Sequence, residues 1–208
     1  MAIFPDSQIP DATDYADAYF VQLAAGAASI DRAAVREAAA LITKTIQASG
    51  RIYSCGNGGS AAIANHLVCD CLKGIRTNTT IKPQVYSLST TVETITAIGN
   101  DIGYEQIFRF QLESLAHECD LLIAISSSGG SPNIIEALEF AKDAGMKTIA
   151  MTGFSGGEAA KLADISLHVA IENYGVVEDL HQSLMHLLSQ YVRQQHLTDP
   201  SIIGKVKF

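Results

Sequence analysis

The chain has 208 residues, of which 48% are hydrophobic and 17% charged, and Asp plus Glu outnumber Lys plus Arg by 22 to 14. This composition predicts a globular protein with a sizeable core, and the formal net charge of −8 argues against a nucleic-acid or anionic-membrane surface. We expect a cytoplasmic protein, because no stretch resembles a signal peptide or a membrane helix and the four cysteines lack CxxC spacing.

Two helices are predicted before the first strand, over residues 11–30 and 31–50. Both place apolar residues at helical spacing, with Asp31 as an N-cap and Gly50 as a C-cap signal for the second. These segments form the N-terminal part, about residues 11–50, of a single domain that we expect to span residues 1–208.

An α/β core is predicted over about residues 51–196. Strands that are nearly continuous in apolar residues alternate with helices there, which indicates a parallel sheet covered on both faces. The expected strands are 51–55, 84–89, 121–126, 147–153 and 165–171. The expected helices are 61–74, 91–116 with an interruption near 99–101, 131–145, 157–164 and 176–196.

A glycine-rich loop, Gly56-Asn57-Gly58-Gly59-Ser60, follows the first predicted strand. Glycines let a ligand approach the backbone, and the start of the next helix offers free N–H groups to an anion. The loop formally matches a dinucleotide-binding pattern, but the acidic residue expected about 20 positions later to hold a ribose is missing. A phosphorylated ligand without a nucleotide is therefore favoured, and a tight turn that binds no ligand is the alternative.

A serine-rich loop, residues 126–131 with the sequence SSSGGS, follows the third predicted strand. Its hydroxyls and the N-terminus of the next helix would together cradle a phosphate. The simpler alternative is that Ser131 only caps the helix. Ligands in parallel α/β sheets bind beyond the carboxyl ends of the strands, where both loops would lie.

Two helices carry polar residues with the spacing of a single face. His66 and Asp70 lie at i and i+4, so they can share a metal ion, work as a base and its orienting partner, or form a surface hydrogen bond. Glu178, Gln182 and His186 form a second stripe at i, i+4 and i+8, which is either a site or a solvated helix face. His181 is a less certain member of that stripe.

Six motifs occur in order along the chain: GNGGS, the helical His-x-x-x-Asp, GND at 99–101, SSSGGS, MTGFSGGE and VEDLHQSLMH. Together they resemble the sugar isomerase (SIS) domain family, in particular its sedoheptulose 7-phosphate isomerases. The resemblance implies a flavodoxin-like, three-layer α/β sandwich with a five-stranded parallel sheet flanked by helices. It also implies a homotetramer with active sites between subunits, a phosphosugar substrate, ketose–aldose isomerisation for nucleotide-activated heptose synthesis, and often a zinc ion.

The resemblance also implies roles for individual residues. Substrate contacts carry over to Asn57, Gly58, Gly59, Ser60, Asn100, Asp101, Ser126, Ser127, Ser128 and Ser131, with Asp70 and Glu178 added. Metal positions carry over to His66, Asp70, Glu178 and His186. Catalytic roles carry over to Asp70, Glu178 and His186. One of the two carboxylates would transfer one proton, and His186 would transfer the other.

This chain departs from the family pattern at two positions. Asp70 and Glu178 stand where the family enzymes have Glu and Gln, and a carboxylate moved by about 1 Å can cost two orders of magnitude in rate. The competing interpretations are a non-catalytic SIS-domain protein that binds a phosphosugar or a replication initiator, and a nicotinamide-dependent oxidoreductase. The His/carboxylate residues favour an enzyme over the first, and the missing ribose carboxylate disfavours the second.

Overall fold

A computed structural model describes residues 3–205 of the chain, and its centre is a parallel sheet of five strands in the order β2-β1-β3-β4-β5. This order is the flavodoxin-like arrangement that the resemblance implied, with the chain reversing its winding direction between β1 and β3. All four strand pairs are parallel. The strands are β1 (Arg51–Gly56), β2 (Gln84–Ser87), β3 (Leu121–Ser126), β4 (Lys147–Thr152) and β5 (Ile165–His168).

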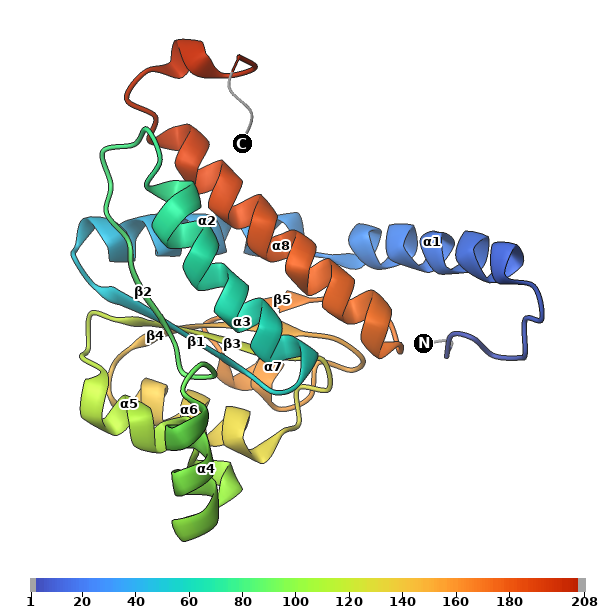
Figure 1. Ribbon diagram of the computed structural model, residues 1–208, viewed down its shortest axis with the longest axis horizontal. Coiled ribbons are helices and arrows are strands. Elements are labelled where there is room, and N and C mark those ends of the chain that lie inside the picture. The colour runs from blue at the N-terminus through green and yellow to red at the C-terminus, as the bar shows by residue number, and fades with distance from the viewer. Residues whose placement is uncertain (1–2, 206–208) are drawn as a thin grey trace.

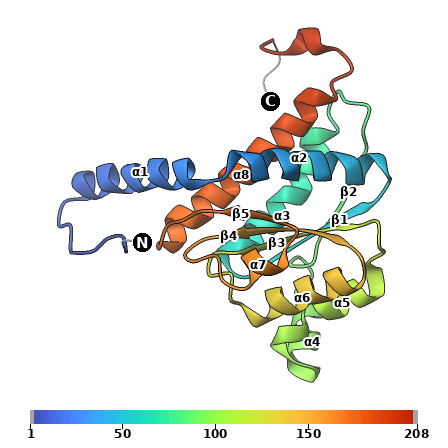
Figure 2. The same cartoon turned by 180° about the vertical axis from the view of Figure 1, so that it is seen from behind.

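Helices cover both faces of the sheet, and the alternation of side chains along β3 divides the core in two. Leu121, Ile123 and Ile125 point into one half, and Leu122 and Ala124 point into the other. Figures 1 and 2 show the sheet between the two helical layers. One layer contains α2 (Arg32–Gln47), α3 (Gly59–Cys69) and α8 (Tyr174–Gln195), and the other α4 (Val92–Asp101), α5 (Arg109–Leu115), α6 (Pro132–Asp143) and α7 (Ala159–Leu162).

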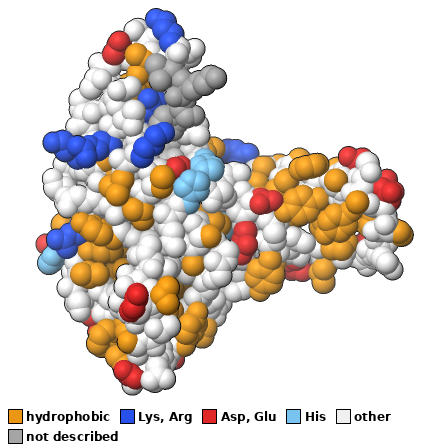
Figure 3. Space-filling model, in the orientation of Figure 1, with side chains coloured by type: hydrophobic (Ala, Val, Ile, Leu, Met, Phe, Trp, Pro, Cys, Tyr) orange, Lys and Arg blue, Asp and Glu red, His pale blue; other side chains and the backbone are white. Residues whose placement is uncertain are grey.

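The first helix, α1 (Ala12–Ser29), projects from the body of the molecule (Figures 1 and 2). It packs on α8 close to its own C-terminal end, where Gly26 is buried against Leu180. Apolar side chains cover much of the projecting arm in Figure 3, and Phe20 and Val21 are each 64% exposed. None of the described helices combines the length and the apolar character needed to cross a membrane.

The end of α2 corrects one expectation. Asp31 caps the helix as predicted, accepting a 2.8 Å hydrogen bond from Ala33 N. The left-handed residue after the helix, however, is Ser49 with φ of 60°, and not Gly50. Gly50 is glycine for a different reason, because a Cβ there would collide with the carbonyl oxygen of Cys119.

The helix after β1 also differs from its predicted limits of 61–74. It begins at Gly59, and its last part, Asp70–Ile75, is a π-helix. Such π turns are rare overall, and those that occur are often found at functional sites. This one begins at Asp70, a predicted site residue. The segment predicted as an interrupted helix over 91–116 consists of α4, a 3₁₀ turn at Tyr104–Gln106, and α5.

Asp120 joins the start of β1 to the loop before β3. Its side chain is almost fully buried and accepts hydrogen bonds from Arg51 N at 2.7 Å and from His117 N at 2.9 Å.

We predict that Asp120→Ala lowers the free energy of unfolding by about 1–3 kcal/mol, because two backbone donors lose their acceptor. Urea unfolding tests this, with Asp120→Asn as the milder variant that keeps one acceptor. A change below about 0.5 kcal/mol for Asp120→Ala would contradict the prediction.

Candidate active site

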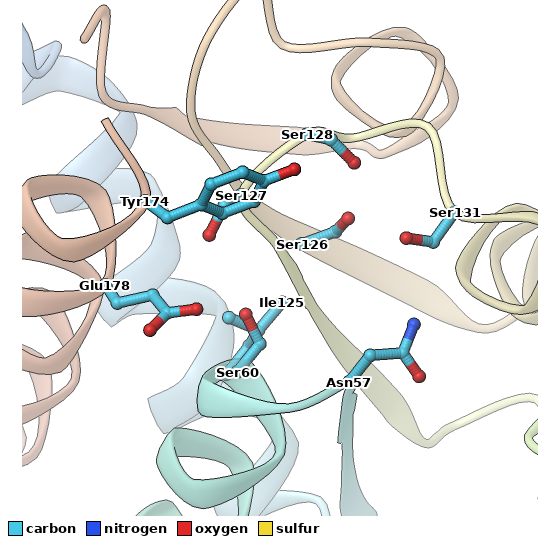
Figure 4. A pocket seen from close by; sticks show the side chains of 9 residues that line it. All are labelled: Asn57, Ser60, Ile125, Ser126, Ser127, Ser128, Ser131, Tyr174 and Glu178. Atoms are coloured by element: carbon cyan, nitrogen blue, oxygen red, sulfur yellow. The ribbon is translucent and has the colours of Figure 1, made fainter. Parts of the chain in front are cut away.

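A cavity of about 110 Å³ lies beyond the carboxyl ends of β1 and β3, where both predicted loops meet. Among the described residues that line it, Glu178 is the one charged side chain, and there is no Lys or Arg. An anion in this cavity would therefore be held by hydroxyls and backbone amides. The lining residues are Asn57, Ser60, Ile125, Ser126, Ser127, Ser128, Ser131, Tyr174 and Glu178 (Figure 4).

Two helices begin at this cavity with uncapped N-termini. Gly58 precedes α3 and Ser131 precedes α6, and neither residue forms a side-chain capping hydrogen bond. The hydroxyls of Ser126, Ser128 and Ser131 face a common space in Figure 4. Helix N-termini attract anions through their free N–H groups and their dipole, so this end of the cavity suits a phosphate.

Ser127 adds a second polar feature to the cavity wall. Its hydroxyl is buried and has no hydrogen-bond partner in the structure of residues 3–205. Leaving a buried polar group unpaired costs about 1–3 kcal/mol, so such groups are uncommon outside sites that await a ligand.

Asn57 is held in place by its neighbours. Its amide exchanges two hydrogen bonds with the buried amide of Asn133, at 2.9 and 2.8 Å, and its Oδ1 also accepts from the Tyr104 hydroxyl at 3.1 Å. These bonds fasten the glycine loop to α6 and to the turn after α4. Asn133 was missed from the sequence, although its place in the first turn after the serine loop was a usable signal.

Glu178 faces the glycine loop from α8. A Cβ at residue 59 would overlap its carboxylate, so the carboxylate lies directly against Gly59. Burial, and to a lesser degree the negative charge of Asp179, raise the pKa of Glu178 above its ordinary value. The side chain thus offers a carboxyl group of increased basicity to whatever occupies the cavity.

Farther along α3 and α8, three predicted residues form what we call the cation cluster: His66, Asp70 and His186. His66 Nε2 lies 3.3 Å from Asp70 Oδ1, and His186 Nε2 lies 3.7 Å from Asp70 Oδ2. Two ligands that are each about 2.0–2.1 Å from a tetrahedral zinc ion lie about 3.3–3.4 Å apart. The donor set and its spacing therefore fit a divalent metal ion.

The cavity and the cluster lie along the same pair of helices. His66 follows Ser60 by six residues on α3, which is about 9 Å at 1.5 Å per residue, and His186 follows Glu178 by about 12 Å on α8. Since α3 packs against α8, the two polar stripes face each other. An extended ligand with an anionic end could therefore contact both.

For three predicted residues, the structure does not show all the neighbours expected of them. Glu178 lines the cavity but does not belong to the cation cluster. Asn100 and Asp101 end α4, where Asn100 Nδ2 donates to Asp101 Oδ1 at 2.7 Å, and they do not line the cavity. Their contact with a substrate and the metal role of Glu178 stay predictions.

His181, the less certain member of the stripe on α8, is a core residue. It is fully buried, and neither ring nitrogen has a hydrogen-bond partner within the described chain. Burial lowers its pKa to about 4, so the imidazole is neutral near pH 7.

The free hydroxyl of Ser131 leads to a paired prediction. Ser131→Ala should weaken the binding of inorganic phosphate by at least about tenfold, since hydrogen bonds to a charged group contribute about 1.5–3 kcal/mol, and should leave stability unchanged. Asp31→Ala is the matched cap variant, and we expect it to cost about 1 kcal/mol of stability without affecting phosphate binding. Calorimetry and thermal unfolding give both readouts. A stability loss for Ser131→Ala with unchanged phosphate affinity would assign Ser131 to capping alone.

Comparison with known proteins agrees with the fold and shows the family. The SIS domain model matches residues 15–153. Phosphoheptose isomerases of Akkermansia muciniphila and Aliarcobacter butzleri are 36% and 39% identical to this chain, over 77% and 76% of it and 85% and 83% of their own lengths.

Two solved structures show the same likeness. The phosphoheptose isomerase GmhA from Neisseria gonorrhoeae superposes with a TM-score of 0.80 at 30% identity, covering 88% of this chain and 98% of its own. A phosphoheptose isomerase from Francisella tularensis gives 0.81 at 33% identity, covering 88% and 96%. The chain therefore belongs to the SIS domain family and, within it, to the phosphoheptose isomerases.

Proposed function

We propose that this protein is an isomerase that interconverts sedoheptulose 7-phosphate and D-glycero-D-manno-heptose 7-phosphate for nucleotide-activated heptose synthesis. Relatives named phosphoheptose isomerase at 36–39% identity support the reaction. The observation that carries the proposal is the alignment of a serine-lined cavity with a His–Asp–His cluster along α3 and α8. The serine-lined cavity suits a phosphate, and the His–Asp–His cluster suits proton transfer.

The phosphate end of the substrate would bind at the serine loop. Ser128 and Ser131 donate to the phosphate oxygens, and Ser126, Ser127 and the N-terminus of α3 complete the cradle. Asn57 shapes the glycine loop through its bonds to Asn133 and Tyr104. The phosphate would thus fix the sugar chain along the groove between α3 and α8.

The reacting carbons would lie at the cation cluster. Ketose–aldose isomerisation moves a proton between adjacent carbons through an enediol, so it needs a base, an acid and a group that polarises the carbonyl. Asp70 faces His186 there, and we assign one proton transfer to Asp70 and the other to His186 through its Nδ1, since His186 Nε2 faces the metal position. Glu178 lies nearer the glycine loop, where its raised pKa suits a hydrogen bond to a sugar hydroxyl.

The cluster would hold a zinc ion through His66, Asp70 and His186. When bound, zinc would act as a Lewis acid that polarises the substrate carbonyl. The two oxygens of Asp70 face different histidines, and Oδ2 also accepts a 3.3 Å hydrogen bond from the Ser189 hydroxyl.

We also propose that the enzyme is a cytoplasmic homotetramer with sites between subunits. Two observations support a second copy near the site. The projecting arm of α1 carries exposed apolar side chains, including Phe20 and Val21. The side chains of His66 and His186 are 45% and 40% exposed, so this end of the groove is open in the single chain.

Turnover of sedoheptulose 7-phosphate tests the function. We expect an aldoheptose 7-phosphate from the zinc-loaded protein and none after the metal has been removed. His186→Ala should lower kcat by about 100-fold or more, because general acid–base groups contribute at least that much, while the exposed His117→Ala should have no effect. Binding of the phosphosugar without turnover in either state would instead favour the non-catalytic alternative.

A further inference from the structure

Gln182 completes a closed ring of contacts at the cation cluster. It lies on α8, one turn before His186, and its side-chain amide reaches across to α3. Gln182 Nε2 is 3.0 Å from His66 Nδ1 and 3.0 Å from His186 Nε2, and both histidines also face Asp70. None of the roles assigned above uses this residue.

The contacts of the amide link its orientation to the tautomers of both histidines. An amide nitrogen carries two hydrogens, so it can donate to both ring nitrogens only if neither of them carries a proton. The proton of His66 must then be on Nε2, where it faces Asp70 Oδ1 at 3.3 Å. In this arrangement the proton occupies the ring nitrogen that is needed to bind a cation.

Binding a cation reverses these requirements. The lone pair of His66 Nε2 must face the ion next to Asp70, so the proton moves to Nδ1 and needs an acceptor. His186 Nε2 must also be released by the amide nitrogen. A half-turn of the Gln182 amide meets both needs, because it puts Oε1 in the place of Nε2, next to His66 Nδ1. An acceptor on the second nitrogen is what orients most metal-binding histidines.

We propose that Gln182 positions His66 for a divalent cation, with an amide that donates to both rings in the cation-free protein and accepts from His66 Nδ1 when the cation binds. The inference rests on the metal site of the proposed function and does not depend on the identity of the sugar. Gln182 is thus a positioning residue, which acts on the cation through the imidazole.

Zinc affinity measured by competition with a chelator, on the full chain without substrate, tests the proposal. Gln182→Leu keeps a similar volume and removes the amide, so we expect zinc to bind about tenfold more weakly. Gln182→Glu keeps an acceptor for Nδ1–H and should bind zinc at least as tightly as the wild type. Gln190→Leu removes an exposed glutamine two turns farther along α8 and should change nothing.

The position of the histidine proton gives a second readout that a merely structural role would not change. Nitrogen-15 NMR of histidine-labelled protein should show the His66 proton on Nε2 without zinc and on Nδ1 with zinc. In cation-free Gln182→Leu the preference for Nε2 should weaken. Circular dichroism confirms that each variant is folded.

Unchanged or tighter zinc binding by Gln182→Leu would overturn the proposal, as would a wild-type chain that binds no zinc or carries the His66 proton on Nδ1 in both states. Failure of the isomerase assignment would look different. In that case zinc affinity would still depend on Gln182, while sedoheptulose 7-phosphate would not be turned over.

Discussion

The packing of α3 against α8 is the constraint on which the site depends. The two helices cover the same face of the sheet, and each carries a polar stripe toward the other. Apolar side chains such as Ile63, Leu67, Leu184 and Leu188 bury the remaining faces of the helices in one core. The free energy of burying that core therefore holds His66 and Asp70 opposite Gln182 and His186, although single polar contacts at a surface contribute little.

The start of α3 links this groove to the sheet. The glycine loop begins directly at the end of β1, and the bonded pair Asn57–Asn133 ties it to α6, the helix that follows the serine loop. The first two turns of α3, from Ser60 to His66, thus set the distance between the proposed phosphate cradle and the cation cluster. A rigid spacing of this kind selects the length of a substrate as well as its chemistry.

The electrostatics of the cavity are unusual for a phosphate site. The chain carries a net charge of −8, and among the described lining residues the cavity contains a carboxylate and no cation. In Figure 4, Glu178 lies on one side and the Ser128 and Ser131 hydroxyls lie on the other. Repulsion from Glu178 would favour binding of the phosphate at the serine end. The placement of the serine hydroxyls and of Glu178 within the cavity, and not the net charge of the protein, would therefore orient the substrate.

Much of the fold and part of the site could be predicted from the sequence, for identifiable reasons. Apolar strands such as 121–126 and the i, i+4 spacing of His66 and Asp70 are local patterns, and both are confirmed. The role of Gln182 could not be predicted, because its amide bridges two helices that are far apart in sequence. Likewise, the sequence predicts Gly50 as the cap of α2, whereas the left-handed residue is Ser49 and Gly50 is restricted by Cys119, which is distant in the chain.

A crystal structure of the zinc-loaded protein with sedoheptulose 7-phosphate tests the proposed placement of the substrate. We expect phosphate oxygens within hydrogen-bond distance of the Ser128 and Ser131 hydroxyls, with the carbonyl end of the sugar beside Asp70 and His186. A phosphate bound at the cation cluster, or outside the cavity at the ends of β1 and β3, would contradict it.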